Sequence, residues 1–245
     1  MLSGGQSENR LLAALPLPDA ELLRRHLRST VLSPQSIIFD TGDSINKVYF
    51  PYSGAVSLVV VLAGGQMIET AIVGKDGMMG GFAALDTQPA CCRAIVQLEG
   101  AAWAIEVELL RQIARSRPHV HSLLLRHERV LLAQTQQVSA CNASHPLEAR
   151  LCRWLLRASD ACGKATLSTT QESISEILGV RRTSISLVAH NLQQAGYIRT
   201  RRGHIELLDW EALRQEACEC YEKTAIHYNQ LLTTAIPPLV DAEIA

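Results

Sequence analysis

The chain lacks the features that mark membrane proteins, secreted proteins and most enzymes. Its longest apolar stretch, residues 56–63, is far shorter than the roughly 20 residues of a membrane helix, and no basic-then-apolar secretory pattern opens the sequence. It contains no phosphate loop, nucleophile elbow, HExxH motif or paired-carboxylate motif. We therefore expect a cytoplasmic protein that is not an enzyme and has no membrane partner.

The seven cysteines form neither a CxxC pair nor a Cys/His set with zinc-finger spacing. Their scatter and odd number indicate reduced thiols that serve as small buried side chains. The pairs Cys91–Cys92 and Cys218–Cys220 stay open as minor redox or metal candidates. The sequence thus predicts no metal site and no cofactor, and leaves an unidentified small effector open.

Neither sign of charge dominates the chain, whose net charge is -1, but the charges are segregated. Residues 146–208 carry nine Lys or Arg against five acidic residues, whereas residues 209–245 carry two against seven. A basic segment inside an otherwise neutral protein is typical of a DNA-contacting module.

The length of 245 residues favours two domains, and the residue pattern of the first is typical of β-structure. Leucines up to residue 30, interrupted by Pro16 and Pro18, predict a short helical cap. Beyond it, short β-branched and aromatic runs alternate with turn signals, which predicts an α+β protein with a small antiparallel barrel or roll in its first domain, residues 1–117. The expected strands are 36–39, 47–50, 54–61, 68–73, 94–98 and 101–105, with turns at 41–43, 63–65 and 99–100.

A long helix is expected over residues 118–143, because Pro118 suits a first helical turn and the pattern that follows is helical. Apolar residues recur there every seven positions beside a companion row, and this favours a parallel homodimer through the helix. Packing of the same helix on the chain's own barrel is the alternative. The two rows are Leu124, Leu131 and Val138, and Val120, His127, Gln134 and Cys141.

Residues 168–192 read as two helices around a glycine turn. Thr169 and Glu172 are expected to form a capping box, and Gly179 to supply the turn. The second helix has an apolar stripe at Ile185, Val188, Ala189 and Leu192, so the residues between them face outward. We predict that these read base edges, while Arg181 binds phosphate. The predicted base readers are Arg182, Thr183, Ser186, Leu187 and His190.

Residues 196–208 alternate apolar and polar side chains around a basic turn, as a wing does. Arg199, Arg201 and Arg202 are predicted to contact phosphate, with a merely solvated hairpin tip as the alternative. The expected winged helix-turn-helix domain spans 144–208. A helical extension, 209–245, is expected to pack on it.

With these residues in place, the chain resembles the Crp/Fnr family from Leu22 to Leu208. Gly42, Gly54 and the run Gly74–Gly80 stand where that family has its turn glycines. The resemblance implies that residues 1–117 form a cyclic-nucleotide-binding-like β-roll of the jelly-roll type, a sensor domain. It also implies a bacterial transcription regulator that binds a palindromic site in double-stranded DNA as a homodimer. RNA polymerase would be a partner of an activator.

The departures from the family concern its known signals. Gly81 stands in place of the glutamate that holds the ribose of cyclic AMP, and Arg93 lies beside the position of the phosphate-binding arginine, so cyclic AMP is not expected. No cysteine precedes Cys91, which argues against the iron–sulfur cluster of the oxygen-sensing branch. In the recognition helix Arg182 is retained, whereas Thr183 and Leu187 replace the family's best-known contacts.

If an effector binds, it is expected where the roll meets the long helix. The residues proposed for it are Gly80, Gly81, Arg93, His127 and Gln134. The buried polar groups among them would otherwise fix the helix register. The alternative function is a cytosolic ligand-binding adaptor whose winged helix docks protein instead of DNA.

Overall fold

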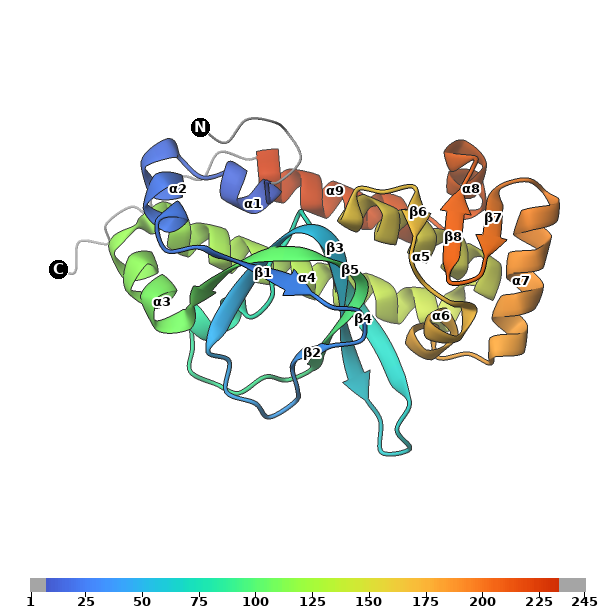
Figure 1. The fold of residues 1–245 in the computed structure, drawn as a ribbon, viewed down its shortest axis with the longest axis horizontal. Helices are drawn as coiled ribbons and strands as arrows, with labels where there is room; N and C mark the ends of the chain where they lie inside the picture. Colours follow the sequence, from blue (N-terminus) through green and yellow to red (C-terminus); the bar gives the residue numbers. More distant parts are fainter. Residues whose placement is uncertain (1–7, 234–245) are drawn as a thin grey trace.

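The computed structural model describes residues 8–233, in which an antiparallel sheet and a winged helix are joined by one long helix (Figure 1). The N-terminal elements are α1 (Arg10–Ala13), α2 (Leu17–Arg24), β1 (Arg28–Leu32), β2 (Ile37–Phe39), β3 (Lys47–Val61), β4 (Met67–Val73), η1 (Gly81–Ala84), β5 (Arg93–Glu106) and α3 (Val107–Ser116). The C-terminal elements are α4 (Pro118–Ser144), α5 (Leu147–Cys162), β6 (Thr166–Leu167), α6 (Gln171–Leu178), α7 (Arg182–Gln194), β7 (Ile198–Arg201), β8 (His204–Leu207), α8 (Trp210–Glu216) and α9 (Cys220–Thr233).

The N-terminal sheet has the order β1-β5-β3-β4, with β2 paired to β5, and every pair is antiparallel. Its apolar side chains form one core with the flanking helices, and Val48, Phe50 and Val96 are among its buried members. The α+β class predicted from the sequence is confirmed.

Two expected interruptions of strands are wrong. Strand β3 continues through residues 51–53, between the expected strands 47–50 and 54–61, and β5 continues through the turn expected at residues 99–100. The pairing of β3 with β5 shifts register around residues 51–56. Gly54 has φ +76°, and a Cβ on Gly100 would lie 2.2 Å from the Ser53 carbonyl oxygen. The glycines at 54 and 100 thus let two strands bend and touch, as in a bulge, so residues 99–100 make no turn.

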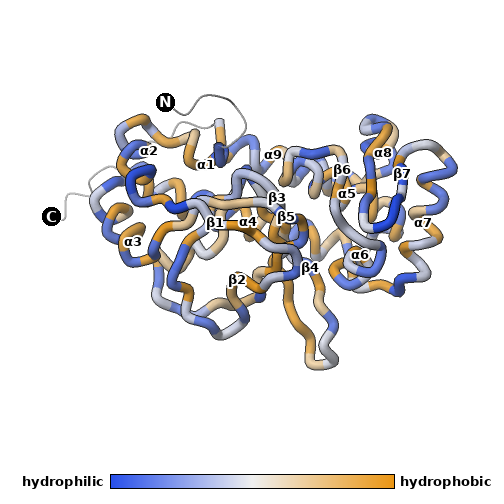
Figure 2. Tube along the Cα trace, viewed as in Figure 1, coloured by the Kyte–Doolittle hydropathy of each residue, from blue (hydrophilic) through white to orange (hydrophobic). Residues whose placement is uncertain are grey.

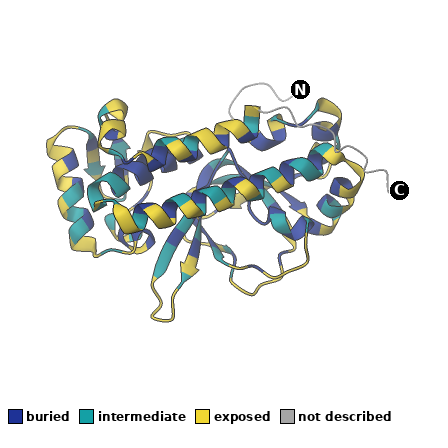
Figure 3. Cartoon of the chain, turned by 180° about the vertical axis from the view of Figure 1, so that it is seen from behind, coloured by how far each residue is buried: buried dark blue, intermediate teal, exposed yellow. Residues whose placement is uncertain are grey.

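Pro118 is the first residue of α4, as predicted, but the heptad rows of this helix are buried within the chain itself. His127 and Cys141 have no exposed surface, and Leu131 is partly buried. They pack against β4, the roll core and α9, which runs beside α4 (Figures 1 and 3). The two rows are thus covered within one chain, as the alternative of packing on the chain's own barrel describes, while the homodimer through α4 stays a prediction.

Helix α5 lies between the winged helix and the roll and is buried almost all around. Its Trp154 packs in a core that also contains Ala55 and Ile72 of the roll, and its indole N–H donates to Glu69 at 3.2 Å. Arg157 donates to both carboxylate oxygens of Asp76, at 2.9 and 3.1 Å, with both side chains buried. The two domains are thus in tight contact.

The C-terminal extension only partly follows the expectation. Helix α8 packs on α5, with Leu213 in the core of the winged helix. Helix α9 instead returns along α4, and its Tyr228 and Leu231 enter the core of the roll. The rest of the extension, from residue 234, and residues 1–7 of the first predicted domain lie outside the described residues. No helix within 8–233 is long and apolar enough to cross a membrane.

Candidate nucleic-acid interface

Helix α6 and the turn after it place the next helix of the motif. The N-cap of α6 is Thr170, whose hydroxyl accepts from the Ser173 amide at 3.1 Å. The predicted capping box of Thr169 and Glu172 is therefore wrong, because the cap lies one residue later and Glu172 instead pairs with Arg182. Gly179 ends the helix with φ +65°, and a Cβ there would lie 2.3 Å from Ile68 of β4. The left-handed backbone favours glycine at this turn, and a larger residue would also have to displace the Ile68 side chain.

Helix α7 buries the apolar stripe predicted for it and exposes the opposite face. Ile185, Ala189 and Leu192 are buried, and Val188 is partly buried against them. On the outer face, Leu187 is 64% exposed. The predicted base readers share this face, where Ser186 is half-buried and the others are exposed: Arg182, Thr183, Leu187 and His190. Arg181, at the N-cap, is exposed as well.

Two of these side chains have partners within the motif. Arg182 forms an ion pair with Glu172 of α6 at 2.9 Å, and both side chains are largely exposed. Such an exposed pair contributes roughly 0–1 kcal/mol and opens readily. Ser186 donates to the side-chain oxygen of Gln171 at 2.7 Å. The guanidinium of Arg182 is thus free to exchange partners, whereas Ser186 also supports the contact between α6 and α7.

The wing is a hairpin of β7 and β8, with β6 as the third strand of its sheet. Its turn carries Arg201 and Arg202, both exposed, and this stretch is hydrophilic blue in Figure 2. Arg199 is paired with Glu206 across the hairpin at 3.0 Å. Gln193 of α7 accepts from the Thr200 amide at 2.8 Å, which fixes the wing against α7. The wing therefore presents two cations beside the outer face of α7.

Not all of the basic residues counted in segment 146–208 lie on this face. Arg153 and Arg157 are buried at the contact with the roll, and Arg150 donates to the Leu178 carbonyl oxygen at 2.7 Å. Only some of the positive charges counted in this segment therefore lie on the surface of the winged helix, and the others are used inside the protein.

The polar side chains proposed for an effector, His127, Gln134 and Arg93, have partners within the chain. Gly80 and Gly81 are buried, with Ile45 beside Gly80 and Met78 beside Gly81, and the Nε2 of His127 accepts from the Met78 amide at 3.1 Å. Gln134 accepts from the Tyr228 hydroxyl at 2.9 Å. Both polar side chains on α4 are therefore used to fix packing inside the chain.

Arg93 lies at the start of β5. It donates to both carboxylate oxygens of Asp40, at 2.5 and 3.1 Å. These hydrogen bonds hold the pKa of Asp40 below its ordinary value. To bind a phosphate, Arg93 would have to break its ion pair with Asp40. The favourable interaction with the phosphate would then be offset by the loss of that ion pair.

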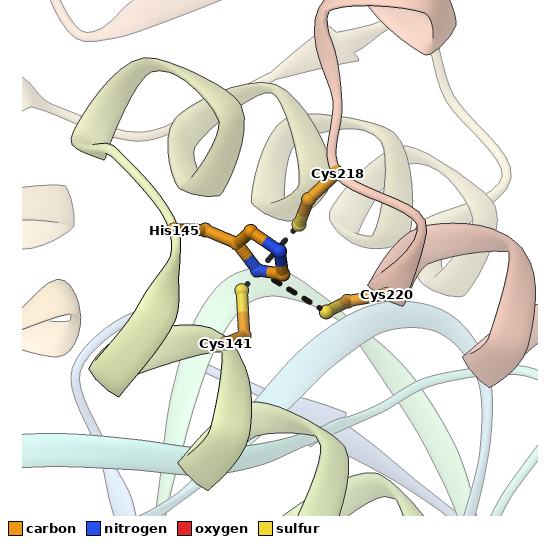
Figure 4. A group of neighbouring side chains, drawn as sticks. All are labelled: Cys141, His145, Cys218 and Cys220. Atoms are coloured by element: carbon orange, nitrogen blue, oxygen red, sulfur yellow. Dashed lines mark hydrogen bonds between the residues drawn. The ribbon is translucent and has the colours of Figure 1, made fainter.

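The structure also brings together four side chains that the sequence left separate. Cys141 and His145, at the end of α4, meet Cys218 and Cys220, at the start of α9 (Figure 4). The sequence contains the two pairs as Cys-x3-His and Cys-x-Cys, but Cys141 and Cys218 are 77 residues apart. Spacing alone could flag each pair and could not join them.

Comparison with known proteins gives two matching family models. Residues 29–117 match the cyclic nucleotide-binding domain, and residues 149–216 match the Crp-like helix-turn-helix domain. A CRP-like cAMP-activated global transcriptional regulator of Mycobacterium tuberculosis is 24% identical over 187 residues, which cover 74% of this chain and 84% of that protein.

Solved structures share the fold. FixK2 of Bradyrhizobium japonicum has a TM-score of 0.66 at 15% identity, over 78% of this chain and 98% of that chain. A transcriptional regulator of the CRP family from Thermus thermophilus has a TM-score of 0.60 at 25% identity, over 77% and 96% of the two chains.

Proposed function

Since the chain belongs to the Crp/Fnr family of transcription regulators, we propose that it binds a palindromic DNA site as a homodimer, through α7 and the wing. The observation that carries this proposal is the exposed outer face of α7 beside the two exposed arginines of the wing, Arg201 and Arg202. A DNA major groove admits such a helix, and the flanking phosphates attract the arginines.

The side chains on this face divide into two roles. Arg182 can bind the two acceptors of a guanine, Thr183, Ser186 and His190 can reach base edges, and Leu187 can touch a thymine methyl group. Phosphate binding falls to the arginines at the helix start and on the wing, which add affinity and not sequence preference. These are Arg181, Arg199, Arg201 and Arg202.

The homodimer needs a different face of α4 from the one the sequence suggested. Leu125 and Leu132, seven residues apart, are 48% and 58% exposed, and Arg129 and Gln136 lie exposed on the same side. This is the face of α4 seen from behind in Figure 3. Two leucines at heptad spacing on an uncovered helix face suit a helix–helix contact between two copies.

Cyclic AMP is not the effector in this proposal, although the relative from Mycobacterium tuberculosis is described as cAMP-activated. Gly81 offers no carboxylate to a ribose, and Arg93 is held by Asp40. The two strongest polar anchors for a cyclic nucleotide are thus missing or engaged. Calorimetry with cyclic AMP tests this directly, and micromolar binding would overturn it.

The DNA-binding proposal is tested by selecting sites from random double-stranded DNA with the full chain and measuring affinity as salt is varied. We expect a palindrome with half-site centres about 34 Å apart and a steep fall of affinity with salt. A salt slope near zero would instead favour the adaptor function.

The dimer face is tested by sedimentation of Leu125→Glu and Leu132→Glu variants, with Leu187→Glu as a matched exposed leucine outside α4. The first two are expected to yield monomers and the third a dimer. A wild-type chain that sediments as a monomer at micromolar concentration would contradict the homodimer.

A further inference from the structure

The cluster at the junction of α4 and α9 consists of four side chains whose donor atoms all lie within 4.8 Å of one another. Cys141 and His145 lie one helical turn apart at the end of α4, Cys218 lies in the link after α8, and Cys220 opens α9 (Figure 4). The sulfurs of Cys141 and Cys218 are 3.5 Å apart, as are the Cys220 sulfur and His145 Nδ1.

These separations match the edges of a metal-centred tetrahedron. A zinc ion binds thiolate sulfur at about 2.3 Å and imidazole nitrogen at about 2.0–2.1 Å, which places neighbouring ligand atoms about 3.5–3.8 Å apart. Three thiolates and one imidazole are also a common structural zinc set. We propose that Cys141, His145, Cys218 and Cys220 bind one divalent ion of the zinc class.

The side chains around the cluster support this ligand set. His145 turns Nδ1 toward the sulfurs, while its Nε2 lies 3.3 Å from Glu219, a carboxylate that would hold the imidazole in the tautomer with Nδ1 free to bind. The Gln137 amide donates to the Cys220 sulfur at 3.0 Å. Such outer partners orient ligands and are usual in metal sites.

The charge of the site is also balanced from the protein. Three thiolates and a divalent ion leave one negative charge in a largely buried place. The guanidinium of Arg153 is close enough to act on Cys141, and Arg150 interacts with the charges of Cys141 and Cys218. Two cations thus offset the net charge of the occupied site.

Other interpretations of the cluster fit less well. A disulfide needs its sulfurs about 2.05 Å apart, whereas Cys141 and Cys218 are 3.5 Å apart, and it would give no role to His145. An iron–sulfur cluster places several atoms between its thiolates and needs wider spacing. Cys162 shows an ordinary buried thiol in this protein, because its sulfur donates to two carbonyl oxygens and meets no other cysteine or histidine among the described contacts.

The position of the site gives the ion a structural consequence. One ligand pair precedes the winged helix in the chain and the other follows it, so residues 146–217 are enclosed between them. A bound ion would tie the end of α4 to the start of α9 and close this loop. Ions that bind only the folded state stabilise it by mass action.

The test uses the full chain, reduced, stripped of metal and titrated with Co²⁺. We expect one Co²⁺ per chain, with the near-ultraviolet thiolate charge-transfer band and the intense visible bands of a tetrahedral site, followed by displacement with Zn²⁺ and a higher melting temperature. Cys141→Ser and Cys220→Ser should lose these bands. Cys162→Ser, in which the new hydroxyl can keep donating to the same carbonyls, should retain them.

Because a cysteine variant can fail to fold, Glu219→Gln serves as a second variant at an exposed position. It should fold normally and bind Co²⁺ about 10–100-fold more weakly. The proposal is overturned if the wild type binds no stoichiometric Co²⁺, if Cys141→Ser and Cys220→Ser keep the bands, or if the purified chain carries an iron–sulfur chromophore at these cysteines. None of these readouts depends on DNA binding.

Discussion

At the scale of single residues, the proposed interface assigns different roles to the outer face of α7, which would read bases, and to the wing, which would bind phosphates. Arg182 lies within the first turn of α7, and its partner Glu172 is exposed and weakly held. Arg201 is the last residue of β7, at the tip of the wing. The two arginines therefore serve as probes of two different contributions to binding.

For Arg182→Ala we expect discrimination at one guanine to fall by about 1–3 kcal/mol, while the other positions keep their preference. For Arg201→Ala we expect all DNA sequences to bind more weakly by a similar factor, with the salt slope reduced by about one. Fluorescence anisotropy over single-base variants of the selected site measures both. Identical profiles for the two variants would contradict the division of roles.

Glu69 is a second informative residue, since it is buried where α5 meets the roll. Burial raises its pKa above the ordinary value of about 4.3, although hydrogen bonds from Ser57 and Trp154 oppose the shift. A carboxyl whose pKa is raised by folding contributes stability that is present at low pH and lost as the pH rises through the folded-state pKa.

We therefore expect Glu69→Gln to gain stability relative to wild type as the pH rises from 4 to 8, because the free energy of unfolding of wild type falls over this range. Urea unfolding across this range measures the difference. The exposed Glu99→Gln is the matched control and should parallel wild type. A Glu69→Gln curve that also parallels wild type would show that folding does not raise the pKa of Glu69.

At the scale of elements, the sequence predicts what is local and periodic. The start of α4 at Pro118 and the buried stripe of α7 follow from proline geometry and helical spacing, and both are confirmed. It does not tell whether Gly54 and Gly100 make turns or let two strands touch, because that depends on the partner strand. The covering of α4 by α9 is equally non-local.

The same limit applies to the sites. The exposed face of α7 could be predicted because its own buried stripe defines it. Arg93 could not be placed, since its partner Asp40 comes from another strand connection. The cluster at Cys141 was missed for the same reason, because its two halves flank a whole domain.

The glycine contact of β3 and β5 gives a prediction for the sheet. Gly54→Ala must adopt φ +76° and place a Cβ 2.6 Å from the Leu98 carbonyl oxygen, so we expect a loss of more than about 1 kcal/mol. Gly64→Ala, with open space around it, is the control and should change stability little. Urea midpoints compare the two, and equal midpoints would refute the bulge argument.

At the scale of the whole molecule, the roll and the winged helix are held together by buried polar contacts as well as apolar ones. Arg157 bridges the two domains through Asp76, and its guanidinium lies 4.3 Å from the ring centre of Tyr228 on α9. A buried pair of this kind stabilises little in total, but removing one partner leaves a charge without compensation.

Asp76→Asn is therefore expected to cost about 3–5 kcal/mol of unfolding free energy, while the double variant Asp76→Leu, Arg157→Met should recover much of it. Chemical unfolding of the single and double variants measures this. Little change in Asp76→Asn would mean that the pair is solvated in solution.

The return of α9 to the roll also determines how the molecule can move. Two domains joined by a single connection can swing about it. Here the chain leaves the roll along α4 and passes through the winged helix. It then returns along α4 as α9, whose Tyr228 and Leu231 are anchored in the roll core. Mechanically this is a closed linkage, in which the recognition helix cannot be re-aimed unless α9 slides or peels from α4. The DNA-binding surface can therefore change its orientation only in a motion that also releases α9 from α4.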